Sequence, residues 1–246
     1  MKKLVIIALA GVFLAYGWAR GAGAADVKVG SALSSAYVWR GITFNDGLVF
    51  QPSIDVGNGG FGLNVWGNMD LDDYGDQLDS GQFSEIDLTL SYSFDVDPVS
   101  VSLGYIEYLF PQTDEGGALG TREIYLSLGM DIIENLSAGL KGYYDFDEVE
   151  DYYINFSLNY NIPLIEPVSI DLAAAAGYAG DEYAADGDAG FFDYLLTLGV
   201  NYAISESLSL TASVNYTDAF DDDKLPDGDF AQDVNTFGVL SVSYSF

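Results

Sequence analysis

The sequence alternates apolar and polar residues with a period of two over many separate stretches. In residues 152–161 one set of alternate positions is Tyr152, Ile154, Phe156, Leu158 and Tyr160, and the other set is mostly Asn and Ser. A strand sorts such residues onto two faces, whereas a helix would scatter them around its circumference. The pattern therefore predicts β-strands that each carry one apolar and one polar face.

Twelve such segments follow residue 25. They are Asp26–Arg40, Leu48–Val56, Phe61–Met69, Glu85–Phe94, Val99–Tyr108, Arg122–Met130, Leu136–Asp145, Tyr152–Asn161, Val168–Tyr178, Tyr194–Ala203, Leu208–Thr217 and Val234–Phe246. Neither a helical pattern nor a linker interrupts them. We therefore expect residues 25–246 to form a single all-β domain, a transmembrane antiparallel up-and-down barrel of about 12 strands.

The connections between the segments alternate in length. Short ones are 57–60, 95–98, 131–135, 162–167 and 204–206, and between them lie 70–84, 109–121, 179–193 and 218–233, with shorter members at 41–47 and 146–151. Outer-membrane barrels have short periplasmic turns and longer extracellular loops. A soluble β-sandwich or lipocalin-like barrel is the alternative, but it would bury its apolar face and would not require this alternation.

The polar faces carry mainly Ser, Thr, Asn and Gly. Twelve strands enclose a lumen too wide to be filled by small polar side chains alone. We therefore expect the apolar faces to point outward, toward lipid. Aromatic residues near strand ends, such as Tyr37, Trp39, Tyr92, Phe94, Tyr216 and Tyr244, are typical of the aromatic girdles at both membrane interfaces.

The N-terminus has the pattern of an export signal. Lys2 and Lys3 precede an apolar stretch over residues 4–19, and Ala22-Gly23-Ala24 forms a small-residue cleavage site. A membrane-spanning helix is the alternative, but the stretch is short against the roughly 20 residues that a bilayer requires. We expect residues 1–24 to be a cleaved secretory signal peptide, and the rest to reach a bacterial outer membrane through the periplasm.

The C-terminus ends in alternating apolar and Ser residues, with Tyr244 two positions before a terminal Phe246. This ending resembles the signature that the barrel-assembly machinery reads in outer-membrane barrels. The N-terminal half resembles a known family. Residues 35–43 (SAYVWRGIT), 50–55 (FQPSID), 60–68 (GFGLNVWGN) and 84–87 (SEID) are similar in order to the Gcw_chp (TorF-like) proteobacterial family. That resemblance implies an outer-membrane barrel and leaves the activity open, because the family has no assigned function.

Charge and composition exclude several functions. Removing Lys2, Lys3 and Arg20 leaves five of the eight basic residues against 38 acidic ones, a formal charge of −33. Such a charge argues against nucleic acid as a partner. Without His or Cys, neither a Ser–His nor a Cys–His arrangement can exist. A carboxylate pair could act as acid and base, but no local constellation stands out. We expect no enzyme, no catalytic residues and no cofactor other than a divalent cation such as calcium.

Strand alternation assigns seven charged residues to the lumen. They are Lys28, Arg40, Asp55, Asp87, Glu123, Lys141 and Asp171. They either tie opposite walls together or form a charged constriction that selects ions. A turn at 131–135 would place Lys141 opposite Tyr125 and diagonal to Glu123, within reach of its side chain.

Acidic residues gather in the longer connections. The candidate cation-attracting residues are Asp70, Asp72, Asp73, Asp145, Asp147, Asp181, Asp186, Asp188, Asp221, Asp222, Asp223, Asp227 and Asp229. They form either a solvated acidic surface or sites for divalent cations, whose preferred ligands are carboxylate oxygens. Residues 221–229 lack the spacing and the terminal Glu of a calcium loop, so no metal ligands are assigned.

Together these features predict a monomeric, porin-like barrel that passes small solutes and favours cations. The alternative is a non-conducting surface barrel whose acidic loops bind divalent cations, lipopolysaccharide or a partner. Outer-membrane lipids and lipopolysaccharide would surround either barrel, and neither function involves nucleic acid.

Overall fold

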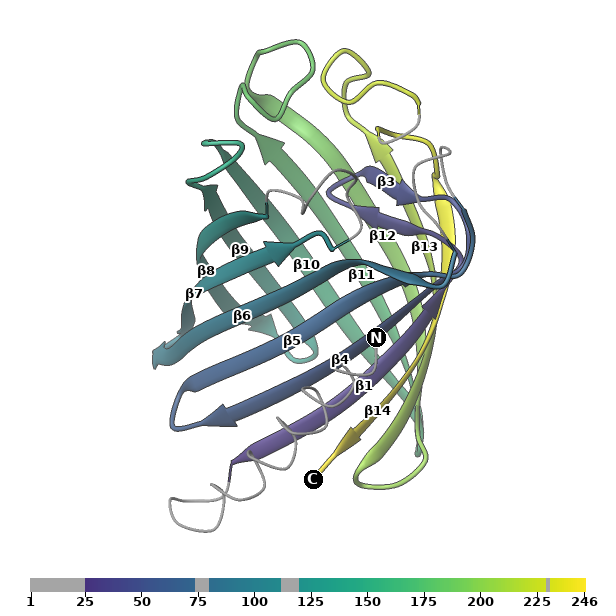
Figure 1. The fold of residues 1–246 in the computed structure, drawn as a ribbon. Coiled ribbons are helices and arrows are strands. Elements are labelled where there is room, and N and C mark those ends of the chain that lie inside the picture. The colour runs from purple at the N-terminus through teal and green to yellow at the C-terminus, as the bar shows by residue number, and fades with distance from the viewer. Residues whose placement is uncertain (1–24, 74–79, 112–119, 229–230) are drawn as a thin grey trace.

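The computed structural model describes residues 25–73, 80–111, 120–228 and 231–246. Within these residues, twelve strands pair antiparallel into a closed barrel with the ring order β1, β14, β13, β12, β11, β10, β9, β8, β7, β6, β5 and β4 (Figure 1). The predicted barrel of about 12 strands is confirmed. None of the described residues belongs to a helix long and apolar enough to cross a membrane. The predicted signal peptide, residues 1–24, lies outside the described residues.

The strand boundaries follow the predicted segments closely. The strands are β1 (Asp26–Ser34), β2 (Tyr37–Trp39), β3 (Ile42–Asn45), β4 (Val49–Asn58), β5 (Phe61–Asp70), β6 (Gln82–Val96), β7 (Val99–Leu109), β8 (Thr121–Ile133), β9 (Leu136–Asp145), β10 (Tyr152–Ile165), β11 (Val168–Ala179), β12 (Gly190–Ala203), β13 (Leu208–Ala219) and β14 (Thr236–Ser245). Most strands extend beyond the prediction at one end or both, because turn residues continue the ladder pairing.

The two ends of the barrel differ. Tight turns join the strands at the lower end in Figure 1, where β1 also begins and the C-terminus lies. The longer connections, including those after β11 and β13, lie at the upper end. An even number of strands places the two ends of the barrel sheet at the same rim, as the predicted alternation of connections requires.

One prediction about the first strand was wrong. The segment 26–40 is not a single strand, because β1 ends at Ser34 and the chain then leaves the wall of the barrel. Residues 37–45 instead form a separate two-stranded hairpin, β2 and β3, which we call the hairpin. Trp39 pairs with Ile42 across a two-residue turn in which Arg40 (φ 51°) and Gly41 (φ 76°) both have positive φ. Positive φ at both central positions is the geometry that type I′ hairpin turns require.

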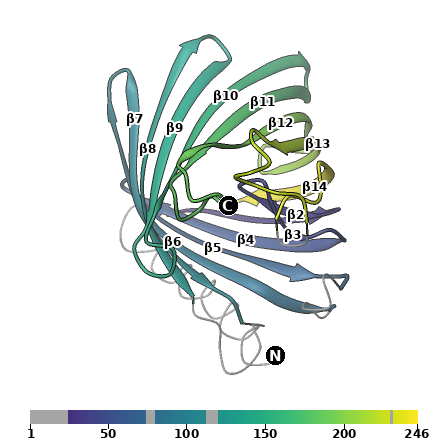
Figure 2. The same cartoon turned by 90° about the horizontal axis from the view of Figure 1, so that it is seen from above.

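The hairpin crosses the interior of the barrel. It connects β1 and β4, which are neighbours in the ring, yet its side chains reach Glu85 on β6 and Glu123 on β8. Those strands are far from β1 around the ring, so the contacts run through the lumen. Seen from above, the hairpin lies within the outline of the strands (Figure 2).

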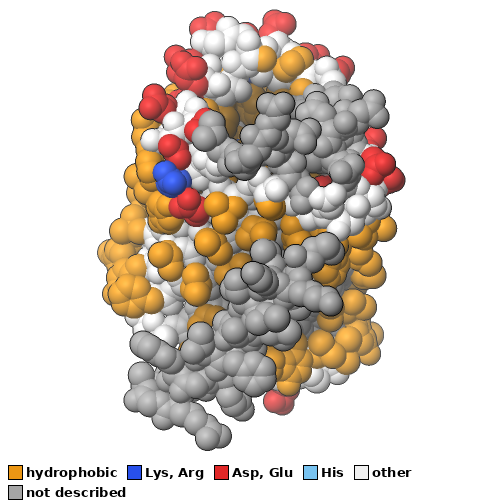
Figure 3. Space-filling view, in the orientation of Figure 1, with side chains coloured by type: hydrophobic (Ala, Val, Ile, Leu, Met, Phe, Trp, Pro, Cys, Tyr) orange, Lys and Arg blue, Asp and Glu red, His pale blue; other side chains and the backbone are white. Residues whose placement is uncertain are grey.

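These contacts fix which face of each strand points inward. Glu123 on β8, Tyr143 on β9 and Tyr153 on β10 contact the hairpin, so they point inward. The residues directly before and after them in each strand therefore face the outside. That outward set carries large exposed apolar side chains, among them Leu33, Leu63, Leu90, Leu103, Leu126, Leu140, Leu158, Leu172, Leu198, Val214 and Leu240. On the face shown in Figure 3, hydrophobic side chains form a broad band, with most carboxylates gathered above it.

A small apolar cluster lies at the upper end of the barrel. Tyr153, Ala179, Phe192 and Leu225 are buried together, and Ile42 of the hairpin packs against them. The backbone of Thr43 donates to the carbonyl of Ala231 over 2.7 Å. The hairpin and the connections after β11 and β13 therefore pack as one body over the upper part of the lumen.

Candidate functional site

The interior at the level of the hairpin holds a buried ion pair. Nη1 and Nη2 of Arg40 donate to Oε1 and Oε2 of Glu123 over 2.7 and 2.8 Å. The two side chains are 6% and 1% exposed. A bidentate pair of this kind is stronger and more directional than a single hydrogen bond.

Tyrosine hydroxyl groups complete the environment of Glu123. Tyr108 donates to Oε2 over 2.8 Å and Tyr183 donates to Oε1 over 3.0 Å. Aromatic rings surround the guanidinium carbon of Arg40, with centroids at 4.1 Å for Trp39, 4.4 Å for both Tyr143 and Tyr153, and 5.6 Å for Tyr183. We call Tyr108, Glu123, Tyr143, Tyr153 and Tyr183 the cage.

The charge of Arg40 is fixed by this environment. Burial alone would lower the pKa of Arg40, but the adjacent Glu123 carboxylate raises that pKa above its ordinary value. Burial raises the pKa of the Tyr183 hydroxyl, which stays protonated and can donate to Glu123. The cage therefore holds a cation at every physiological pH.

The hairpin has two further anchors on the wall. The hydroxyl of Tyr37 donates to Oε2 of Glu85 over 2.8 Å, and burial, followed by the charges of Glu85 and Asp87, raises the pKa of that hydroxyl. Nδ2 of Asn45 donates to Oδ1 of Asp70 over 2.9 Å. The hairpin is thus held at its tip, at its start and at its end.

The predicted lumen residues lie at several levels, and they do not form one cluster. Arg40 and Glu123 meet directly, and Asp87 on β6 lies two positions from Glu85 with one carboxylate oxygen buried and without a hydrogen-bond partner in the described structure. Lys28 on β1 is opposite Asp55 in the ladder to β4. Near the lower end, Asp171 accepts hydrogen bonds from Asn161 and Asn201.

The predicted pairing of Lys141 was wrong. Lys141 lies opposite Ser127, not Tyr125, because β8 continues to Ile133 and its turn to β9 is only two residues long. Its ammonium lies 3.9 Å from the ring centroid of Tyr125 and 4.7 Å from that of Tyr143. Glu123 lies opposite Asp145 and four positions from Ser127, so Lys141 is not diagonal to it as predicted. The cation beside Glu123 is therefore Arg40 of the hairpin.

The candidate cation-attracting residues differ in their surroundings. Asp70 and Asp145, both 1% exposed, lie on strand ends and accept hydrogen bonds, so they are anchors of the fold. Several others bind the protein itself. Asp72 and Asp73 accept from backbone N–H groups, Asp147 pairs with Arg122, Asp186 pairs with Lys224, whose ammonium also donates to the carbonyl of Asp188, and Asp221 accepts from the N–H of Asp223.

The remaining candidate residues face water or are outside the description. Asp181, Asp222, Asp223 and Asp227 are exposed, and Asp229 lies outside the described residues. Among the described residues, no group of three or more carboxylates is arranged to hold a metal ion.

The sequence analysis missed the aromatic part of the site. No site role was predicted for Tyr143, Tyr153 or Tyr183, and the expectation that Tyr37 and Trp39 lie in an aromatic girdle was wrong, because both belong to the hairpin inside the barrel. Trp39-Arg40-Gly41-Ile42 nevertheless carries the signal of a hairpin turn, a Gly between two strand-forming runs. A methyl group on Gly41 would lie 2.6 Å from Cβ of Asp193. Only Gly fits this position, and the tight fit brings Arg40 to the cage.

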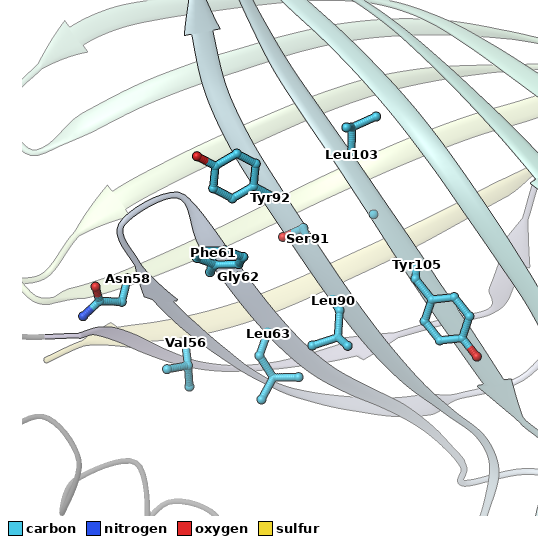
Figure 4. A pocket seen from close by; sticks show the side chains of 11 residues that line it. Val56, Asn58, Phe61, Gly62, Leu63, Leu90, Ser91, Tyr92, Leu103 and Tyr105 are labelled. Carbon is cyan, nitrogen blue, oxygen red and sulfur yellow. The ribbon is translucent and has the colours of Figure 1, made fainter. Parts of the chain in front are cut away.

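An apolar hollow of about 630 Å³ lies away from this site. Figure 4 shows its lining side chains, among them Leu63, Leu90, Leu103 and Tyr105 on β5, β6 and β7. These residues belong to the outward-facing set, so the hollow lies on the outside of the barrel.

Comparison with solved structures identifies the class of fold. The KdgM porin in complex with disordered oligogalacturonate is 13% identical, with a TM-score of 0.55 over 90% of this chain and 99% of that chain. The NanC porin is 12% identical, with a TM-score of 0.52 over 91% of this chain and 100% of that chain. The COG4313 outer membrane channel from Pseudomonas putida F1 is 12% identical, with a TM-score of 0.52 over 92% of this chain and 96% of that chain. The chain has the fold of outer-membrane porins and channels.

The chain belongs to the Gcw_chp family, described as bacterial protein of unknown function, which it matches over residues 18–246. The predicted family is confirmed, and the match extends well beyond the segments between residues 35 and 87 that carry the resemblance in sequence. No curated protein matches the sequence.

Proposed function

We propose that the barrel is a passive channel for small hydrophilic solutes, with cations favoured. The observation that carries the proposal is the inner wall. Alternate residues of the strands place Ser, Thr, Asn and Gly toward the lumen, as in Asn155, Ser157 and Asn159 of β10, while the hairpin occupies only the upper part of it. A small polar wall stays hydrated and does not pack into a closed core.

The preference for cations follows from unbalanced charge. Arg40 is neutralised by Glu123, which leaves Lys28 and Lys141 as inward cations against carboxylates that include Asp55, Asp87 and Asp171. Exposed carboxylates also surround the upper mouth. Oligogalacturonate, the ligand of the KdgM porin, is a polyanion. The acidic interior here favours cationic and neutral solutes instead.

The barrel works without chemical conversion of the solute. Passive transport requires no nucleophile–base pair, and the chain has neither His nor Cys to form one of the Ser–His or Cys–His type. We further propose that residues 1–24 are removed on export, and that the mature barrel is a monomer surrounded by outer-membrane lipid and lipopolysaccharide after insertion by the barrel-assembly machinery. Fractionation of the envelope and N-terminal sequencing should find the protein in the outer membrane with Ala25 first.

Planar lipid bilayers test the channel directly. Purified, heat-modifiable protein should give stepwise conductance, and a salt gradient should give a reversal potential of the sign that cation preference requires. Arg40→Ala should conduct more than the wild type, because the hairpin loses its tip anchor. Protein denatured by boiling is the control. Folded protein without conductance in any salt would refute the proposal.

A further inference from the structure

The cage has the chemistry of a site for an organic cation. It offers Glu123 as a bidentate carboxylate, two tyrosine hydroxyls that bind the same carboxylate, and the ring faces of Tyr143 and Tyr153. A planar guanidinium already occupies it, but that guanidinium belongs to Arg40. The structure thus shows that the cage accommodates a guanidinium.

The cage does not depend on the hairpin for its parts. Tyr108, Glu123, Tyr143 and Tyr153 are on four consecutive strands, β7 to β10, and Tyr183 follows β11. The barrel wall therefore holds most of the cage in place when the hairpin leaves. Arg40, in contrast, comes from a turn in which its own backbone has φ 51°, a conformation uncommon for a residue other than Gly.

The cage discriminates by charge. Glu123 is 1% exposed, and a buried carboxylate without a counter-charge is strongly unfavourable. A neutral or anionic solute would leave that charge uncompensated. A guanidinium or substituted ammonium ion would replace both the ion pair and the contacts with the aromatic faces, which contribute most when the cation is desolvated.

We propose that the cage binds guanidinium-bearing or other organic-cation solutes, and that Arg40 is a tethered internal competitor for the same site. The solute class rests on the proposed channel function, whereas binding itself does not require conduction. A short tether gives Arg40 a local concentration on the order of millimolar. Wild-type protein should therefore bind a free cation weakly, and an Arg40 variant should bind it more tightly.

Binding of methylguanidinium to folded protein in detergent tests this inference, with calorimetry and the aromatic fluorescence of the cage as readouts. Arg40→Ala should bind it saturably, at least about tenfold more tightly than wild type, as expected when a tethered competitor is removed. Lys28→Ala, which removes the same charge from the lumen outside the cage, should bind like wild type. N-methylurea, a neutral analogue of similar shape, should not bind to any of the variants.

The carboxylate is tested by a second change. Arg40→Ala combined with Glu123→Gln should lose methylguanidinium binding. Should Arg40→Ala fold poorly, methylguanidinium should raise its refolding yield and N-methylurea should not. Equal affinity in wild type and Arg40→Ala, binding that survives Glu123→Gln, or a refolding yield insensitive to methylguanidinium would overturn the inference. Binding without conductance in any variant would refute the channel and leave the cage, and conductance without binding would do the reverse.

Discussion

Arg40 and Glu123 are 83 positions apart in the chain, yet their side chains form a bidentate ion pair across the interior of the barrel. One belongs to a turn that has left the barrel wall, and the other is on β8. The pair therefore sets the position of the hairpin in the lumen. It does so more firmly than a single contact, since each carboxylate oxygen of Glu123 has its own donor on Arg40.

Glu123→Ala and Arg40→Ala should each release the hairpin. Removing one member of a buried ion pair typically costs about 3–5 kcal/mol, because the other charge stays buried and unpaired. We expect the amide of Thr43, which donates to Ala231 over 2.7 Å, to lose protection from hydrogen exchange while amides of the barrel keep theirs. The double variant should lose less than the sum of the two single variants.

Arg122→Ala is the matched control. Arg122 also pairs with two carboxylates, Glu107 and Asp147, but it is 45% exposed and faces outward. Exposed pairs contribute about 0–1 kcal/mol. Unchanged protection of Thr43 in Arg40→Ala, or a loss in Arg122→Ala of the same size, would show that the buried pair does not hold the hairpin.

The sequence was sufficient to predict the barrel but not the pairing of its charges. Alternation of apolar and polar residues depends only on local geometry, so Leu136–Asp145 was predicted to the residue and other strands to within a few positions. Register depends on where each turn closes. The positive φ of Asn135 allows a two-residue turn after Ile133, and this shifts Lys141 by two positions along β8.

The hairpin escaped prediction for a related reason. Residues 37–40 continue the alternation of β1, and nothing in a local pattern shows that the chain turns inward after Ser34. The contact of Arg40 with Tyr153 and Tyr183 joins segments more than a hundred residues apart, and only the closed barrel brings these segments together. Arg40 was predicted from its charge and strand parity, while its aromatic partners carried no signal of their own.

Gly104→Ala should destabilise the barrel. A methyl group there would lie 2.2 Å from Cε1 of Tyr125, so the ring would have to move from its place beneath Lys141. Overpacking of this kind typically costs about 1–3 kcal/mol. The temperature at which the protein loses its folded gel mobility should fall. Gly129→Ala on β8 is the control, because a methyl group there meets nothing within 4 Å; equal shifts for both variants would contradict the packing argument.

The contact between Asp186 and Lys224 should depend on pH and be lost in acid. A hydrogen bond from the Lys224 ammonium and then one from the backbone of Asp188 lower the pKa of Asp186 below its usual 3.8. A carboxyl group whose pKa is lowered in the folded protein stabilises the fold at pH values above its pKa in the unfolded chain. This stabilisation is lost as the pH falls through the pKa of the folded protein. The contact should therefore be constant between about pH 5 and 8 and disappear well below pH 4.

Hydrogen exchange of the Ala185 amide, which donates to the carbonyl of Lys224 over 2.9 Å, reports this contact after correction for the intrinsic effect of pH. Protection should fall in acid in the wild type. Lys224→Gln should weaken the acid step, because its neutral side chain removes the largest cause of the lowered pKa of Asp186 and leaves only the hydrogen bond from the backbone of Asp188. An identical acid step in Lys224→Gln would mean that another group titrates.

Neutralising exposed loop carboxylates should weaken cation preference without unfolding the barrel. Asp181, Asp222 and Asp223 are exposed, so Asn at all three positions removes charge at little cost in stability. Their attraction acts over a Debye length of roughly 8–10 Å near physiological salt and weakens as salt rises. The reversal potential should change most in dilute salt. Asp145→Asn, at a buried anchor, should instead lower stability, and a reversal potential unaffected by the triple change would exclude the loops as its source.

Deleting Phe246 should reduce the amount of barrel in the outer membrane. Phe246 is 71% exposed, its ring packs against Tyr244 at a centroid distance of 4.8 Å, and its amide donates to the carbonyl of Val27 on β1. The residue thus lies at the junction where the last strand closes on the first, and its ring adds little buried area. Its absence should affect assembly far more than the stability of barrels already formed.

Quantitative blotting of outer-membrane fractions, beside the thermal gel shift of the purified protein, separates the two effects. The deletion should lower the outer-membrane yield several-fold and shift the thermal transition only slightly, because one backbone hydrogen bond contributes about 0.5–1.5 kcal/mol. Phe246→Tyr should keep most of the yield, since it preserves an aromatic terminus, and Asp222→Asn should behave as wild type. Deletion and Asp222→Asn giving equal yields would show that the terminal aromatic residue has no role in assembly. A large loss of thermal stability in the deletion would assign the residue to closure of the barrel instead.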